Sequence, residues 1–189
     1  MRISSKIILA LVSASTLCIF LKMFKLPYIN QVLEVSMLSL AFFLLGQMFL
    51  GKSLPGGIAY KILQRFACNG MFSATAGILF RFLYWAGWHL EFGVGMVTFV
   101  FSLLLLVKWN IIKTKFPEKF DYFRYNYVLP ICFLVLTSIL SIILPDKVFY
   151  ETFSTLSKTK SYEQFQAENP GRTGYSFFPV LKRAANPND

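Results

Sequence analysis

Four ionisable residues at the ends of long apolar segments are the side chains of this sequence best placed to do chemistry. A charged group inside a membrane is costly and normally has a partner, so each of them merits a functional hypothesis. Lys22 is predicted to pair with Glu34, and Arg81 with Glu91, each pair joining two apolar segments across a short break. The plainer interpretation is that both pairs only clamp two helices together near the lipid headgroups.

The sequence lacks the groups of residues that acid–base, nucleophilic or metal chemistry usually needs. Residues 35–50 and 92–107 contain no ionisable side chain, so neither segment offers a mid-membrane carboxylate that could carry a proton. The three cysteines form no C-x-x-C pair and are expected to be small buried apolar residues. His89 is the only histidine, and it is expected to lie at a membrane boundary. We therefore expect no enzymatic activity and no cofactor.

The chain that carries these residues is strongly apolar. Of its 189 residues, 56% are hydrophobic, 21 are Phe and only 15% are charged, whereas a soluble domain is about a quarter charged. A spanning helix needs roughly 20 apolar residues, and fewer when terminal Lys or Arg side chains reach the headgroups. The apolar runs lack the alternation of barrel strands. They predict an all-α, polytopic membrane helix bundle with about five transmembrane helices: Ile3–Phe24, Ile29–Leu50, Phe66–Tyr84, Leu90–Val107 and Tyr127–Leu144.

Two of the predicted helical hairpins repeat at an offset of 59 residues. Lys6 and Lys22 bracket one uncharged run, and Arg65 and Arg81, each 59 positions later, bracket another. Matched charges weigh more here than matched apolar letters, which are common between any two spans. The repeat predicts two pseudo-equivalent hairpins that pack together. Small residues that would let helices approach closely are Ser13, Ala14, Ser73, Ala74, Ala76, Gly77, Gly93 and Gly95.

The predicted organisation is a transmembrane domain followed by an extramembrane tail. The transmembrane domain covers residues 1–145, with the hairpin repeats at about 6–50 and 65–107 and the fifth span at 127–144. The tail covers residues 146–189.

The tail is predicted to contain a short amphipathic helix over about Lys147–Lys160. Phe149, Phe153 and Leu156 recur there at i, i+4 and i+7, which places them on one helix face. Such a helix would lie along the membrane or the bundle. The apolar residues within 172–189 either stay disordered or dock on a partner, and docking is the preferred interpretation.

Basic residues are shared unevenly between the two ends of the spans. Only Lys22, Lys25 and Arg81 stand in the short breaks, so the opposite, richer side is expected to be cytoplasmic. This predicts a multi-pass protein of the bacterial inner membrane with a cytoplasmic N-terminus and a periplasmic tail. A cleaved signal peptide, with Arg2 and Lys6 as its basic region and Ile7–Leu21 as its apolar region, is disfavoured because the third apolar segment copies the first inside the chain. The ten basic residues of the richer side are Arg2, Lys6, Lys52, Lys61, Arg65, Lys108, Lys113, Lys115, Lys119 and Arg124.

The net charge of +10 favours anionic partners, of which membrane lipids are the first candidate. Residues Lys113–Tyr127 interleave basic and aromatic side chains, which suits a loop lying in the cytoplasmic interface. Nucleic-acid binders show similar interleaving. Because this loop joins two predicted spans directly, we expect lipid and no nucleic acid.

The break from Arg81 to Gly87, RFLYWAG, resembles the basic-x-x-His-Trp-Pro-Gly break between the two membrane helices of GldL. GldL is the gliding-motility and type IX secretion motor subunit of Bacteroidota. The break after Lys22, KMFKLPY, is a weaker version of the same pattern. The matched positions are Lys22 and Arg81 for the basic residue, Trp85 for tryptophan, Pro27 for proline and Gly87 for glycine, with Tyr84 in place of histidine.

The resemblance implies a membrane hairpin subunit of an envelope complex. The family's membrane-embedded glutamate, linked to use of the proton gradient, has Leu40 and Phe99 at about its depth in this chain. Our first hypothesis is therefore a non-enzymatic integral membrane subunit that packs against lipids and other integral membrane subunits. The alternative is a small transporter or proton-coupled carrier with the repeat as its two halves, since parallel repeats occur in transporters.

Overall fold

The computed structural model describes residues 3–26, 28–51, 58–85 and 88–169, and most of these residues are helical. No strand occurs within these ranges, which confirms the predicted all-α class. In chain order the elements are α1 (Ile3–Lys22), α2 (Ile29–Leu50), α3 (Ile58–Leu83), α4 (Trp88–Leu106), α5 (Trp109–Lys115), α6 (Pro117–Phe123), the π-helix η1 (Arg124–Val128), α7 (Leu129–Ile143), α8 (Asp146–Phe153), the 3₁₀-helix η2 (Thr155–Lys158) and α9 (Tyr162–Glu168).

Within the described residues, five helical stretches are long and apolar enough to cross a membrane, which confirms the predicted number. The chain is therefore a multi-pass membrane protein. The last two stretches are longer than predicted, because α5 continues α4, and α6 and η1 precede α7. The five stretches are Ile3–Lys22, Ile29–Leu50, Lys61–Leu83, Phe92–Lys115 and Pro117–Ile143.

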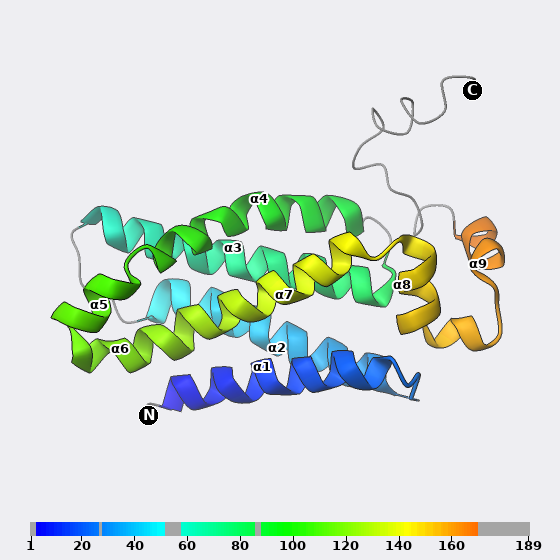
Figure 1. The fold of residues 1–189 in the computed structure, drawn as a ribbon, viewed down its shortest axis with the longest axis horizontal. Helices are drawn as coiled ribbons and strands as arrows, with labels where there is room; N and C mark the ends of the chain where they lie inside the picture. Colours follow the sequence, from blue (N-terminus) through cyan, green and yellow to red (C-terminus); the bar gives the residue numbers. More distant parts are fainter. Residues whose placement is uncertain (1–2, 27, 52–57, 86–87, 170–189) are drawn as a thin grey trace, which may run out of the picture.

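The long helices lie side by side, with α3 at the centre of the bundle (Figure 1). Helix α4 packs along one side of α3 and α2 along another, while α7 crosses α3 and reaches α1. We call the end that carries α5, α6 and the start of α1 the basic end. The opposite end, where α8 and α9 lie beyond the bundle, is the capped end (Figure 1).

Helices α3 and α4 pack closely because glycines stand at their contact. A Cβ added at Gly95 would lie 2.7 Å from the backbone oxygen of Ser73 and 2.9 Å from the Cα of Ala74. A Cβ at Gly70 would collide with the backbone oxygen of Thr98. Small residues at the contact let the two backbones approach, as predicted for Ser73, Ala74 and Gly95.

The first hairpin is held differently from the second. The hydroxyl of Ser15 on α1 donates to the hydroxyl of Ser36 on α2 at 3.3 Å, and both side chains are buried. Ser13, which the sequence predicted to face a neighbouring helix, is exposed instead. Ser36 corresponds to Gly95 at the 59-residue offset. The first hairpin therefore has a hydrogen bond between hydroxyls at the position where the second hairpin has a close glycine contact.

Backbone geometry follows the 59-residue repeat. Helix α2 begins at residue 29 and α4 at residue 88. Lys25 and Tyr84, which correspond at this offset, both adopt a left-handed conformation, with φ of 52° and 55°. All seven buried residues of α1 have buried counterparts on α3. These are Ser5, Ile8, Val12, Ser15, Cys18, Ile19 and Lys22 on α1, and Gln64, Ala67, Met71, Ala74, Gly77, Ile78 and Arg81 on α3.

The segment Lys113–Tyr127, predicted as an interfacial loop, is helical and belongs to the bundle. Phe123 and Tyr127 are fully buried, and their rings stack with centroids 6.0 Å apart. The prediction of a loop was wrong, because the segment forms α5, α6 and η1 and two of its aromatic side chains, Phe123 and Tyr127, pack inside the bundle. Its position at the cytoplasmic interface stays a prediction. Basic residues of the same segment lie over aromatic rings at its surface, with the guanidinium of Arg124 5.4 Å from the Tyr125 ring centroid.

A proline explains the π-helix η1. Pro130 has no N–H to donate to the residue four positions back, and its ring would crowd that carbonyl. The N–H of Leu129 bonds instead to the carbonyl of Arg124, five residues back. The extra residue in this turn brings two consecutive side chains, Asn126 and Tyr127, into the buried interior.

Candidate functional site

Lys22 lies at the capped end, at the last residue of α1, and is only 1% exposed. Its ammonium donates to the side-chain oxygen of Asn30 at 2.7 Å and to the backbone oxygen of Phe82 at 2.6 Å. The predicted pairing with Glu34 is replaced by these contacts. Glu34 is half-buried on α2, and none of its described contacts involves Lys22. Lys22 therefore joins the first hairpin to the second.

Arg81 occupies the equivalent position at the end of α3 and is also 1% exposed. Its guanidinium donates to the carboxylate of Asp146, the first residue of α8, in a buried salt bridge. The same guanidinium lies 4.4 Å from the centroid of the Phe149 ring. An acidic residue in the first turn of α8 also suits the helix dipole. Arg81 thus fixes the start of α8 on the end of α3.

Tyr84 follows α3 and lies among aromatic side chains of the tail. Its ring centroid is 5.9 Å from that of Phe149, 5.7 Å from Tyr150 and 5.7 Å from Phe165. Burial raises the pKa of the Tyr84 phenol well above its usual range. The Tyr84 hydroxyl is buried and makes no hydrogen bond with the described residues. Its left-handed backbone turns the chain at the point where α8 covers the bundle.

Helix α8 packs its apolar face on the bundle, as the sequence predicted. Phe149 and Phe153 are buried against Phe82, with ring centroids 5.0 and 5.1 Å away. The predicted helix is nevertheless too long. It ends at Phe153, η2 turns the chain, and Leu156 is 47% exposed.

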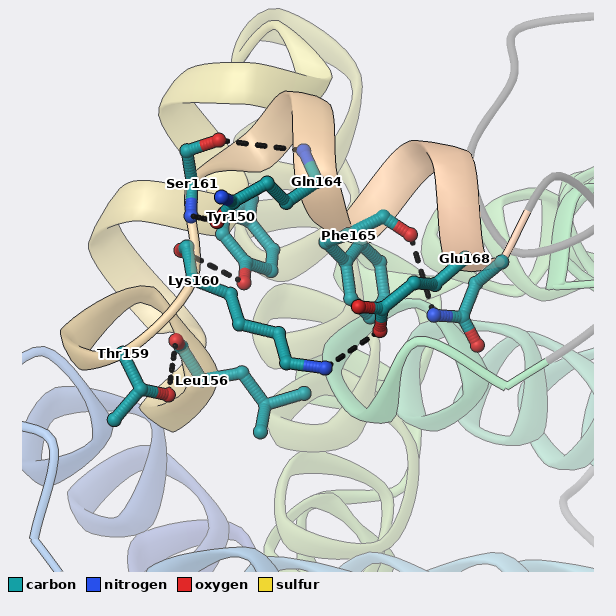
Figure 2. Close-up of polar contacts among 9 residues, drawn as sticks. Tyr150, Leu156, Thr159, Lys160, Ser161, Gln164, Phe165 and Glu168 are labelled. Atoms are coloured by element: carbon teal, nitrogen blue, oxygen red, sulfur yellow. Dashed lines mark hydrogen bonds and ion pairs between the residues drawn. The ribbon is translucent and has the colours of Figure 1, made fainter.

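Helix α9 folds back onto α8 through polar and aromatic contacts (Figure 2). Ser161 and Gln164 form a capping box that starts α9. The ammonium of Lys160 bonds to Glu168 at 2.6 Å, and the Tyr150 hydroxyl donates to the backbone oxygen of Lys160 at 3.3 Å (Figure 2). The rings of Tyr150 and Phe165 stack with centroids 4.8 Å apart. The predicted docking segment 172–189 lies outside the described residues.

The remaining predicted site residues are only partly described. Trp85 is half-buried, and its ring lies edge-on to Phe80 with centroids 4.8 Å apart. Pro27 and Gly87 lie outside the described residues, as do the side chains of two residues of α4, His89 and Glu91. The pairing of Arg81 with Glu91 therefore stays a prediction.

Asp146 and Asn30 are the partners that sequence reasoning missed. The predicted number of spans could have identified Asp146 as a partner of Arg81. Five spans put the start of the tail on the same side as Arg81, and Asp146 is the first carboxylate after the fifth span. The signal for Asn30 was weaker, because an uncharged amide one helical turn from Glu34 is a less obvious partner for Lys22.

A second buried polar cluster lies towards the basic end, around η1. The Asn126 amide donates to the hydroxyl of Ser5 at 2.9 Å and to the backbone oxygen of Tyr122 at 2.8 Å. The Tyr122 hydroxyl donates to Gln47 at 2.9 Å, and the Gln64 amide donates to the Tyr127 hydroxyl. These bonds tie α1, α2 and α3 to the start of the fifth span. The cluster lacks ionisable carboxylates and amines, so it is suited to packing.

The described contacts of Lys22 and Arg81 are charge pairing and hydrogen bonding within the chain. Among the described residues, no group of three His, Cys, Asp or Glu side chains is placed to hold a metal ion. The two buried cations face an amide, a backbone carbonyl and a carboxylate, all supplied by the chain itself. The comparisons with protein-family models, curated proteins and solved structures find no match for this chain.

Proposed function

We propose that this chain is a non-enzymatic integral membrane subunit of an envelope complex in a bacterial inner membrane. The proposal rests on the burial and bonding of the two matched basic residues of the repeat. Lys22 and Arg81 are both buried at the capped end and are both bonded inside the chain. Lys22 joins the two hairpins, and Arg81 joins the second hairpin to the tail. Both residues therefore have a structural role, which supports a scaffold subunit.

The GldL-like breaks give the proposal its more specific form, an accessory subunit of a gliding-motility or type IX secretion complex. In this form the N-terminus and basic end lie in the cytoplasm, and the capped end and tail lie in the periplasm. The excess of basic residues at the basic end supports that orientation.

Purification of the tagged full-length chain from its native membrane tests the proposal. The complex is solubilised gently, and its mass and composition are measured by native mass spectrometry and peptide identification. We expect other integral membrane proteins in fixed stoichiometry. Isolation of this chain without any protein partner from a membrane where it is expressed at native level would contradict the proposal.

A small transporter is the second candidate, and the repeat is the observation that favours it. The matching helix starts and left-handed residues support a repeat of two hairpins, and parallel repeats occur in transporters. Reconstitution of the purified chain into proteoliposomes distinguishes the two. Saturable solute or proton flux by the chain alone would favour the transporter and count against the scaffold.

A further inference from the structure

We infer that an anionic phospholipid binds in a groove between α1 and α7, with its headgroup at the capped end. The groove has a volume of about 300 Å³. It is lined by Val12, Thr16 and Ile19 of α1 and by Leu129, Cys132, Phe133, Leu136, Thr137 and Leu140 of α7. Both helices belong to candidate membrane spans, so the groove lies within the bilayer. This inference is independent of the proposed function.

The groove suits an acyl chain because its lining presents almost no free polar group. The two threonines use their hydroxyls on their own helices. Thr16 donates to the backbone oxygen of Val12 at 2.8 Å, and Thr137 donates to the backbone oxygen of Phe133 at 2.9 Å. The rest of the lining is apolar, and Leu136 is 68% exposed, so the groove opens onto the lipid-facing surface.

The position of the groove fixes the leaflet. At 1.5 Å per residue, Leu129 to Leu140 spans about 16 Å, which is about half of a hydrocarbon core of roughly 30 Å. These residues form the half of the fifth span nearer the capped end, and Val12 to Ile19 form the matching part of α1. A single acyl chain lying there belongs to the leaflet of the capped end, and its headgroup lies beyond Ile19 and Leu140.

Two lysines at that end give the headgroup its charge preference. Lys25 follows α1 and Lys158 closes η2, and the Lys158 ammonium donates to the backbone oxygen of Lys25 at 3.0 Å. Within the described part of the chain, neither lysine has a carboxylate in salt-bridge range. The neighbouring Lys147 and Lys160 are instead paired with Glu163 and Glu168. Two lysines on neighbouring segments, without acidic partners among the described residues, favour a headgroup whose net charge is negative.

Native mass spectrometry of the purified full-length chain in mild detergent tests this site. The probes are phosphatidylglycerol and phosphatidylcholine with identical acyl chains, added over a concentration series. We expect phosphatidylglycerol to bind more tightly. The double variant Lys25→Gln/Lys158→Gln should weaken its binding on the order of thirtyfold, since each of the two lysines near a membrane surface contributes about 1 kcal/mol. The matched control, Lys113→Gln/Lys115→Gln, removes two exposed lysines from the basic end and should have little effect.

Substitutions in the groove test the acyl-chain position. Cys132→Phe places a ring in the groove and should lower retention of phosphatidylglycerol, whereas Val97→Phe, on an exposed site of α4, should not. In the unsubstituted protein, phosphatidylglycerol should slow the reaction of Cys132 with a membrane-permeant maleimide more than phosphatidylcholine does. Cys18 and Cys68 are buried, so this reaction reports on the groove even if Cys132→Phe folds poorly.

Three results would overturn the inference. These are equal affinity for the two lipids, equal loss of binding in the two lysine variants, and maleimide reaction at Cys132 that neither lipid slows. The first two results would mean that the lysines at the capped end do not select an anionic lipid. The third would mean that no acyl chain occupies the groove.

Discussion

At the scale of single residues, the capped end depends on the buried Arg81–Asp146 salt bridge. Asp146→Asn keeps the shape of the side chain and removes its charge, which leaves the Arg81 guanidinium buried beside a neutral amide. Breaking a buried ion pair from one side typically costs about 3–5 kcal/mol. We expect a clear loss of thermal stability for the detergent-solubilised protein, measured by circular dichroism or by a thiol-reactive melting assay.

The control for this prediction is Glu163→Gln, which breaks the exposed pair of Lys147 and Glu163. Exposed pairs contribute little, because water and salt screen them. A double variant, Arg81→Leu/Asp146→Leu, should recover part of the stability lost in Asp146→Leu, since a matched apolar pair leaves no buried charge. Equal melting temperatures for Asp146→Asn and Glu163→Gln would contradict the structural role of the buried pair.

At the scale of helices, the α3–α4 contact requires glycine at two positions. At Gly70 and Gly95, an added methyl group would meet backbone atoms of the neighbouring helix, which cannot rotate away. Gly70→Ala and Gly95→Ala should each destabilise the bundle by about 1–3 kcal/mol, as overpacking does. Gly46→Ala on α2 is the matched control, because nothing lies within 4 Å of the added carbon. It should be neutral or slightly stabilising, since alanine favours helix. Three variants with equal unfolding midpoints would argue against close packing.

The contact between α8 and α9 should weaken in acid. The pKa of Glu163 is lowered to about 2, and the largest cause is the hydrogen bond that it accepts from Lys147 at 2.8 Å. A carboxylate with a depressed pKa stabilises the fold above its unfolded pKa of about 4.3 and loses that contribution as the pH falls through its folded pKa. Hydrogen exchange in α9, corrected for intrinsic rates, should therefore accelerate between about pH 4.3 and pH 2.

Glu163→Gln provides the control for this acid response. The variant should show at pH 6 the faster exchange that the unsubstituted protein reaches only in acid, and its own profile should be flatter. Because both side chains of the pair are exposed, high salt should also reduce the difference. Identical pH profiles for the two proteins would exclude Glu163 as the group responsible.

The elements that could be predicted from sequence are those fixed by local pattern. Long apolar runs bounded by Lys and Arg predict spans directly, and Ile29–Leu50 was predicted with the bounds that the structure has. The helical run through α5, α6 and η1 could not be recognised in this way. Its buried faces are aromatic and its exposed faces basic, and the same composition suits an interfacial loop. Only the burial of Phe123 and Tyr127 in the bundle distinguishes a packed helical segment from an interfacial loop.

The partners of the charged residues were harder to predict than the charges. Lys22 and Arg81 were identified as important because lipid makes charges costly, and both are buried. Their partners were sought on the next helix of the same hairpin, where sequence proximity suggested them. The structure supplies one partner of Lys22 from that helix, Asn30, and the other contacts from residues 60 and 65 positions away, Phe82 and Asp146. Such distant contacts depend on how the hairpins and tail assemble, which local spacing does not encode.

At the scale of the whole molecule, the bundle has a basic end and a capped end. A topology experiment can test on which side of the membrane each end lies. If the five candidate spans of the described residues all cross the membrane, the two ends of the bundle lie on opposite sides. Thr114 lies exposed on α5 at the basic end, and Thr159 lies exposed after η2 at the capped end. Single cysteines at these sites, introduced with Cys132→Ser, report on each side through a membrane-impermeant maleimide.

We expect Thr159→Cys to react in cells whose outer membrane alone has been opened, because the capped end is proposed to face the periplasm. Thr114→Cys should react only after the inner membrane is also disrupted, because the basic end carries the excess of Lys and Arg. The reverse pattern would leave five spans in place but invert the orientation. Reaction of both cysteines from the same side would require an even number of spans, and would place α8 and α9 beside the start of α1, contrary to their position at the capped end of the bundle (Figure 1).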